Sequence, residues 1–289
     1  MTENFEKDEF SGTQTTGHEW DGIKELDTPM PRWWLWTMYA TIIWAIGYWI
    51  IMPAWPMVSS FTKGVIGYSS RGSLEQALAD ASAAHATDRA ALVTMELSAV
   101  KDDARTYQYA LQGGKSAFAV NCSQCHGSGA QGAPGFPNLN DDDWLWGGSV
   151  DKIYETVKYG IRSDHDETRL GEMPAFLDDE LLTRPEISDV ADYVLSLSQS
   201  NSDADAVARG KTVFVEECAS CHGDKATGLR EFGAPNLTDA IWFYGGDKKT
   251  IVRTISKGRA NVMPAWVDRL DDSTIRQMTL FVHSLGGGE

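Results

Sequence analysis

The chain has 289 residues, 42% of them hydrophobic, which suits about two folded domains of ordinary composition. Aspartate and glutamate number 41 against 25 lysines and arginines, so the formal net charge is −16 at pH 7. So acidic a chain has no basic surface for a phosphate backbone, which excludes nucleic-acid binding of that kind, and it attracts basic partners.

The first 32 residues are polar and carry eight acidic side chains against Lys7, Lys24 and Arg32. They contain no short apolar segment followed by a small-residue cleavage site, so we expect no cleaved secretory signal. This composition predicts a flexible tail over residues 1–32.

A membrane span is predicted next. The run "WWLWTMYATIIWAIGYWIIMPAWPMVSSFT", residues 33–62, has no charged residue and exceeds the roughly 20 apolar residues that cross a bilayer as a helix. Tryptophans lie near both ends of the run, as in an interfacial belt, and Pro53 and Pro56 should end the helix. A core helix seldom runs this long without a charge, and a surface helix needs a polar face. We therefore predict one transmembrane helix within residues 33–57.

Residues 73–111 are rich in alanine and predict helix, with Ser73 as the N-cap and Gly113-Gly114 as the end. The apolar positions are mostly small, so the segment either packs on another part of the chain or acts as a semi-rigid spacer. We assign residues 58–112 to a helical linker and expect His85 to face solvent.

All four cysteines lie in two copies of C-x-x-C-H, "VNCSQCHGSG" from residue 120 and "EECASCHGDK" from residue 216. A thioredoxin-like dithiol needs a βαβ setting that is not visible, and the two pairs lie 96 residues apart (218 − 122), far from zinc-ribbon spacing. C-x-x-C-H is the attachment site of c-type haem, in which two thiols bind the porphyrin and the histidine ligates the iron. The sequence therefore predicts two covalent haems, held by Cys122, Cys125, His126, Cys218, Cys221 and His222.

The motif is part of an internal duplication of residues 113–200 and 204–289. "FPNLNDDDWLWGG" matches "GAPNLTDAIWFYGG", "GEMPAF" matches "NVMPAW", and each unit closes with an apolar helical pattern, "ISDVADYVLSLS" or "TIRQMTLFVHSL". A unit of this size is marginal alone, and a covalently held haem adds apolar surface to its core.

Met173 and Met263 are the candidate sixth ligands of the two irons. They lie 47 and 41 residues after His126 and His222, and both precede Pro-Ala and an aromatic residue. A lone methionine usually fills a core, but matching positions in a duplicated unit favour thioether ligation. The sequence leaves open whether each methionine serves the haem of its own unit or that of the neighbouring unit.

Other candidates have simpler explanations. His165 lies among acidic residues in an insertion of the first unit, which favours a solvated loop over ligation, and His283 is matched by Leu195 in the first unit. Trp144 and Trp242 fit a haem pocket and ordinary core packing equally well.

The order of an opening helix, C-x-x-C-H, Pro-Asn-Leu, Met-Pro and a closing helix resembles class I cytochrome c over both units. This resemblance implies an all-α fold in which one N-terminal transmembrane helix precedes two tandem cytochrome c domains, residues 113–200 and 204–289. It implies that His126 and His222 are the proximal ligands. It also implies that the carbonyls of Pro137 and Pro235 accept a hydrogen bond from these histidines.

The stretch "DGIKELDTPMPRWWLWTMYATIIWAIGYWI" followed by "MPAWP" resembles the anchor of the dihaem subunit, of the CcoP or FixP kind, of cbb3-type cytochrome c oxidases. The resemblance runs from about Asp21 to the end of the chain. It implies three partners: a catalytic subunit with b-type haem and copper, a monohaem cytochrome c subunit, and a soluble or anchored cytochrome c donor. Because c-type haem is attached outside the bacterial inner membrane, it implies a cytoplasmic N-terminus and periplasmic haem domains.

A histidine–methionine iron has no open position for oxygen, so it passes single electrons and is not catalytic alone. We therefore expect an electron-transfer subunit that relays electrons from a periplasmic cytochrome c through two haems toward the catalytic subunit. The alternative is a stand-alone, membrane-anchored dihaem carrier that serves other reductases. A haem peroxidase or gas sensor needs one iron without its methionine, and an assembly factor needs neither methionine.

Overall fold

The computed structural model describes residues 6–198 and 203–287. The start of the predicted tail, the end of the second repeat and the predicted boundary at residue 200 lie outside these residues. The chain divides into two compact units, residues 1–84 and 85–289, each of which is described by itself. Apart from one small hairpin the described structure is helical, so the all-α prediction is confirmed.

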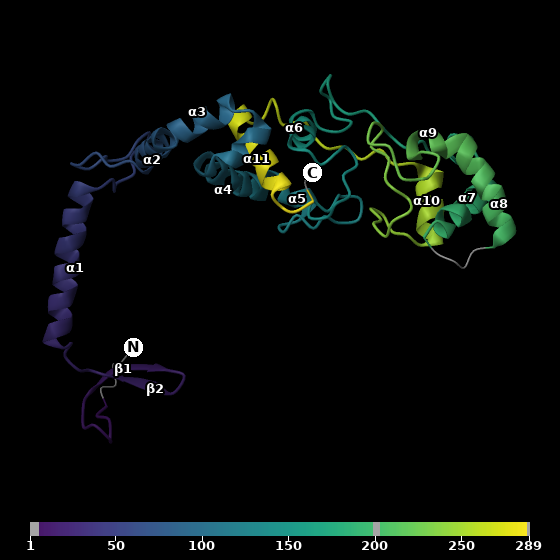
Figure 1. The fold of residues 1–289 in the computed structure, drawn as a ribbon. Helices are drawn as coiled ribbons and strands as arrows, with labels where there is room; N and C mark the ends of the chain where they lie inside the picture. Colours follow the sequence, from purple (N-terminus) through teal and green to yellow (C-terminus); the bar gives the residue numbers. More distant parts are fainter. Residues whose placement is uncertain (1–5, 199–202, 288–289) are drawn as a thin grey trace. The chain divides into compact units, whose positions relative to one another are not determined.

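The first unit contains a β-hairpin and two helices (Figure 1): β1 (Thr15–Trp20), β2 (Ile23–Leu26), α1 (Arg32–Ile51) and α2 (Ser70–Ala84). The expectation of a flexible tail is wrong for the hairpin. Asp21 and Gly22 connect its strands with φ of 49° and 86°, the left-handed values that a tight two-residue hairpin turn requires. The Asp-Gly pair in the sequence is typical of such a turn and could have predicted the hairpin.

Helix α1 has 20 residues and a mean hydropathy of 1.3, long and apolar enough to cross a membrane. It ends before Pro53, as predicted, and the following chain folds back on its end. The Thr62 hydroxyl accepts a hydrogen bond from the backbone N–H of Trp55 (2.9 Å), and the N–H of Val65 donates to the carbonyl of Ile50 (3.0 Å). These contacts satisfy backbone groups at the helix terminus.

The second unit holds the remaining elements: α3 (Ala86–Thr94), η1 (Leu97–Asp102), α4 (Ala104–Asn121), α5 (Ser123–His126), α6 (Val150–Tyr159), α7 (Arg184–Ser196), α8 (Ala204–Val213), η2 (Phe214–Cys218), α9 (Ala219–His222), α10 (Lys248–Lys257) and α11 (Asp272–His283). The alanine-rich segment is therefore several helices. The prediction that Gly113-Gly114 ends a helix is wrong, because α4 continues through both glycines.

Close helix packing explains these glycines. A Cβ on Gly114 would lie 2.1 Å from the carbonyl oxygen of Gln277 on α11, and one on Gly210 of α8 would lie 2.0 Å from that of Asp189 on α7. Two helix backbones approach this closely only where a side chain is missing. The two glycines hold matching places in the repeat, yet each faces the closing helix of the other repeat.

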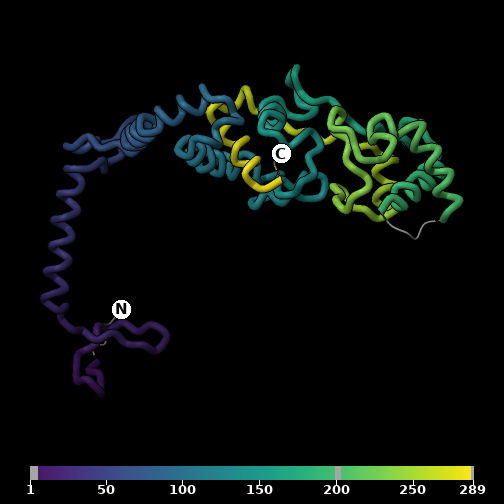
Figure 2. Tube along the Cα trace, viewed as in Figure 1, coloured from purple at the N-terminus to yellow at the C-terminus, as the bar shows by residue number. Residues whose placement is uncertain are grey.

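The helices group into two lobes that exchange their closing helices. The first lobe contains α3, η1, α4, α5, α6 and α11, and the second contains α7, α8, η2, α9 and α10. In Figure 2 the yellow C-terminal helix returns to lie beside the blue α4, while α7 and α8 run side by side in green.

Matched aromatic pairs mark the same exchange. Phe118 of α4 packs on Phe281 of α11 with ring centroids 5.4 Å apart, and Phe214 packs on Tyr193 of α7 at 5.1 Å. Phe118 is 3% exposed and Phe214 is fully buried, so both pairs lie in the cores of their lobes. Each opening helix is therefore completed by the closing helix of the other repeat.

Candidate haem sites

The first C-x-x-C-H motif lies where α4 ends and the short α5 begins. The carbonyl of Pro137 accepts a hydrogen bond from Nδ1 of His126 at 3.1 Å, which fixes the ring and leaves Nε2 for a metal. Burial lowers the pKa of His126 from its usual value, although the bond to Pro137 opposes this shift. The histidine is therefore held neutral, which is the form that ligates iron.

The second motif repeats this arrangement. Nδ1 of His222 donates to the carbonyl of Pro235 at 3.0 Å, and burial lowers the pKa of His222 as well. The helix before this motif differs from α4, because residues Phe214–Cys218 form a π-helical turn. Such turns occur frequently at functional sites.

The first thiol of each motif is partly buried. Burial raises the pKa of both Cys122 and Cys218 to about 11, so both are protonated and neutral at pH 7 when free. Cys125 is exposed and Cys221 is partly buried. Each motif thus places two thiols and one imidazole at the edge of an apolar core.

The candidate methionine ligands lie across the repeat boundary. Met173, from the first repeat, packs in the core of the second lobe with Phe214 and Cys218. Met263, from the second repeat, packs in the core of the first lobe with Phe118 and Cys122. The structure therefore brings Met173 together with the second C-x-x-C-H motif and Met263 with the first.

Short backbone bridges hold the exchanged segments. Ile161 and Met263 exchange two N–H···O bonds, both 2.9 Å, and Arg259 and Met173 do the same at 2.9 and 3.0 Å. A Cβ on Gly160 or Gly258 would lie 2.3 Å from the carbonyl oxygen of Met263 or Met173, and φ is 74° or 64° at these glycines. Only glycine lets the methionine segment pass so close.

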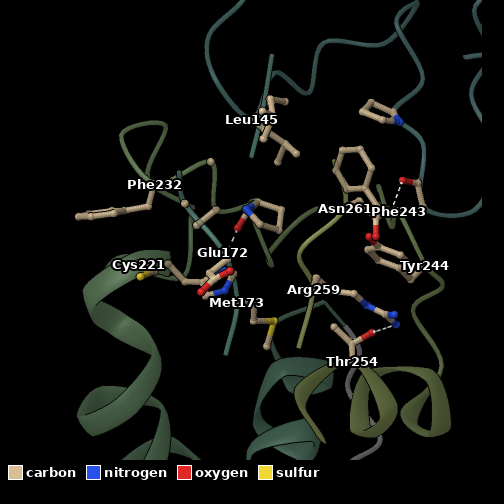
Figure 3. A pocket seen from close by; sticks show the side chains of 18 of the residues that line it. Leu145, Glu172, Met173, Cys221, Phe232, Phe243, Tyr244, Thr254, Arg259 and Asn261 are labelled. Atoms are coloured by element: carbon tan, nitrogen blue, oxygen red, sulfur yellow. Dashed lines mark hydrogen bonds between the residues drawn. The ribbon is translucent and has the colours of Figure 1, made fainter. Parts of the chain in front are cut away.

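The two motifs and both methionines line one continuous cavity of ≈ 520 Å³. Figure 3 shows Met173 and Cys221 in this cavity, with Phe232, Phe243 and Tyr244 around them. A mostly apolar cavity that is lined by two sets of groups, each with two thiols, an oriented imidazole and a thioether, fits covalently bound haem with histidine–methionine ligation.

The other histidines considered in the sequence make different contacts. The ring of His165 lies 4.8 Å from that of Tyr159, and its Nδ1 accepts a hydrogen bond from the N–H of Glu167. Nε2 of His283 lies 3.4 Å from the Lys101 amine. Trp242 both lines the cavity and packs on the core of the second lobe, so the two interpretations of this residue are compatible.

Sequence reasoning missed Gly160, Gly258 and Arg259. Arg259 lines the cavity beside Met173, and its partner position in the repeat is Ile161. An alignment of "YGIR" with "KGRA" on their glycines contained the signal, because it shows a charge in one repeat where the other has an aliphatic residue.

Comparison with known families gives three matches that together cover most of the chain. Residues 12–59 match the N-terminal domain of cytochrome oxidase-cbb3, FixP, residues 111–198 match cytochrome c, and residues 205–282 match cytochrome c oxidase, cbb3-type, subunit III. The last two matches imply two covalently bound c-type haems, as the motifs predicted.

Curated relatives match over nearly their whole length. The cbb3-type cytochrome c oxidase subunit FixP of Bradyrhizobium sp. (strain ORS 278) is 54% identical over 100% of both chains. The subunit CcoP of Cereibacter sphaeroides is 52% identical over 95% of both chains, and the subunit CcoP of Azospirillum sp. (strain B510) is 50% identical over 100% of both. With these relatives and the apolar helix α1, the chain is an inner-membrane protein with two c-type haems, and it belongs to the FixP/CcoP family of electron-transfer subunits of cbb3-type cytochrome c oxidases.

Proposed function

We propose that this chain carries electrons from a periplasmic cytochrome c through its two haems toward the oxygen-reducing catalytic subunit of the oxidase. One observation carries the proposal: both C-x-x-C-H motifs share one cavity with Met173 and Met263. A bound haem supplies a one-electron couple. The two cysteines of each motif would hold it by thioether bonds, and a histidine and a methionine would ligate its iron, which would leave no open position for substrate.

The residues that hold each haem are proposed as a crossed set. His126 and Met263 ligate the haem on Cys122 and Cys125, while His222 and Met173 ligate the haem on Cys218 and Cys221. Three features support this pairing: the packing of each methionine in the lobe that holds the other repeat's C-x-x-C-H motif, the two backbone bridges, and the exchanged closing helices.

Single-haem variants of the full chain test the crossed pairing. With Cys218 and Cys221 replaced by alanine, only the first haem is attached. In this variant Met263→Ala should abolish the far-red thioether-to-iron band, whereas Met173→Ala should leave it. The opposite result would show that each methionine serves its own repeat.

The partners and the topology are also proposed. The family implies a catalytic subunit with b-type haem and copper, a monohaem cytochrome c subunit and a cytochrome c donor. It also implies a cytoplasmic N-terminus and periplasmic haem domains. Alkaline phosphatase fused after residue 289 should be active, and the same reporter fused before residue 6 should be inactive. The reverse activities would overturn this orientation.

Purification distinguishes the oxidase subunit from a free-standing carrier. The tagged chain, extracted in mild detergent, should bring b-type haem bands into the reduced-minus-oxidised spectrum, and Met173→Ala and Met263→Ala should each lower oxygen consumption with cytochrome c as donor. Only c-type bands, or full turnover in both variants, would refute the relay in an oxidase.

A further inference from the structure

Arg259 lies directly beside the candidate ligand Met173. The two residues form an antiparallel pair that exchanges both backbone hydrogen bonds, 2.9 Å from the N–H of Arg259 and 3.0 Å to its carbonyl. Residues opposite each other in such a pair project their side chains to the same face. Both side chains line the cavity, and Figure 3 shows them near one another.

The guanidinium group of Arg259 is only partly satisfied by the protein. Its Nη2 donates to the Thr254 hydroxyl at 2.6 Å, and its central carbon lies 3.7 Å from the centre of the Tyr244 ring. Its Nε is buried and has no hydrogen-bond partner among the described residues. A buried N–H of a permanently charged group is costly to leave unpaired, so this atom points to an anionic ligand in the cavity.

Arg162 is the second arginine of the cavity, but its Nε, unlike that of Arg259, already has a backbone partner. Its guanidinium group donates to the carbonyl of Asn261 from Nε at 2.7 Å and to the carbonyl of Gly171 from Nη1. Burial lowers the pKa of Arg162 while Tyr244 and Glu172 oppose this shift. Arg162 therefore ties loops together, whereas Arg259 keeps a buried donor available.

The two haem sites differ at this position. The pair Ile161–Met263 in the first lobe corresponds to the pair Arg259–Met173 in the second, with the same two backbone bonds and the same preceding glycine. An aliphatic side chain thus stands beside one methionine, and a cation beside the other. A fixed positive charge in a cavity of low dielectric favours the reduced, less positive iron.

We propose that Arg259 binds a carboxylate of the haem on Cys218 and Cys221 and raises the reduction potential of that haem, with no counterpart at the other haem. The carboxylates are the anionic groups of a haem, and a guanidinium with a free Nε–H is suited to bind one. This inference rests on the crossed ligand assignment proposed above.

Redox titration of the full-length, dihaem chain tests the inference. In Arg259→Leu we expect the equilibrium constant for reduction of one haem to fall at least about tenfold, which is about 59 mV for a one-electron couple. The titration has one reduction wave for each haem, and the wave that moves in Arg259→Leu should be the one that Met173→Ala also displaces. The other wave should stay in place. Arg253 is an exposed arginine of α10, six residues before Arg259. Arg253→Leu is therefore the matched control and should move neither wave.

A far-red thioether band of parental intensity in Arg259→Leu shows that the ligands are intact. Three outcomes would then overturn the role of Arg259 without touching the ligand assignment. In Arg259→Leu, both reduction waves could stay in place or both could shift equally. Alternatively, Arg253→Leu could shift one wave as much as Arg259→Leu does. If instead Met173→Ala displaces the wave that Arg259→Leu leaves in place, this inference fails, and the single-haem variants described above decide the ligand assignment separately.

A second variant covers failure of Arg259→Leu to bind haem. Arg259→Lys keeps the charge but not the planar fork, so it should shift the haem carboxylate band in redox infrared difference spectra of chains with ¹³C-labelled haem carboxylates. An unshifted band would show that Arg259 does not touch the carboxylate and would overturn the proposal.

Discussion

Replacing Phe118 and Phe281 by leucine, singly and together, tests the exchange of closing helices. Their ring centroids are 5.4 Å apart, and Phe118 is 3% exposed. An aromatic pair contributes about 0.5–1.5 kcal/mol beyond the area it buries, so the double-mutant cycle should give a coupling free energy of about 1 kcal/mol. The same cycle on Phe118 and Tyr193 should give about zero, because Tyr193 packs on Phe214 instead.

The assay is guanidinium unfolding of the full-length, haem-loaded chain in detergent, followed by haem absorbance. The free energy of unfolding comes from the midpoint and slope of each curve, and the coupling from the four variants of each cycle. The cycle on Phe214 and Tyr193 is the positive control. A coupling between Phe118 and Tyr193, with none between Phe118 and Phe281, would show that each repeat closes on its own helix and would refute the crossed arrangement.

Three further substitutions have distinct readouts. Gly114→Ala adds a Cβ 2.1 Å from a backbone oxygen of α11, so the free energy of unfolding should fall by about 1–3 kcal/mol. The control Ser116→Ala, on the exposed face of α4, should change this free energy little. Equal effects of the two substitutions would contradict tight packing of α4 on α11. Gly258→Ala should push the methionine segment away and weaken the far-red band of one haem, and an unchanged band would contradict the close passage. Burial and two neighbouring aspartates raise the pKa of Asp143 to about 6, so the stability that protonated Asp143 contributes is present below pH ~4 and lost as the pH rises through about 6. Asp143→Asn should therefore stabilise the chain at pH 8 relative to pH 4, by about 1 kcal/mol after allowance for its partial exposure, and a pH-independent difference would refute this.

The sequence was informative wherever chemistry requires fixed spacing. Two thiols and an imidazole must lie within one helical turn to hold a haem, so C-x-x-C-H located both sites without any structure. An uninterrupted apolar run likewise suffices to predict a membrane helix. In lipid the backbone N–H and C=O groups of a single spanning segment must bond to one another, and only a helix allows this. These inferences depend on local sequence alone.

The partner of each closing helix was beyond such reasoning. The two repeats present nearly the same apolar faces. Phe118 and Phe214 are equivalent positions on the opening helices, and Tyr193 and Phe281 are equivalent positions on the closing helices, so either pairing of helices satisfies the hydrophobic pattern. The choice depends on the path of the chain between helices, including the passage over Gly160 and Gly258. An alignment of the repeats shows the charge of Arg259, but not its position beside Met173, which arises only from the exchange.

The exchange sets an order in which the two haem sites are completed along the chain. Every described element that builds the second lobe, from Met173 through α7 to the end of α10 at Lys257, lies before Met263. The first lobe opens earlier, at α3, yet it lacks both its methionine and its closing helix until residues 263–283 are present. Contacts of such long sequence separation form late, because loop closure costs entropy before the contact repays it. The second lobe can therefore gather its ligands first, and the last helix, α11, then closes the first lobe and joins the two repeats into one body.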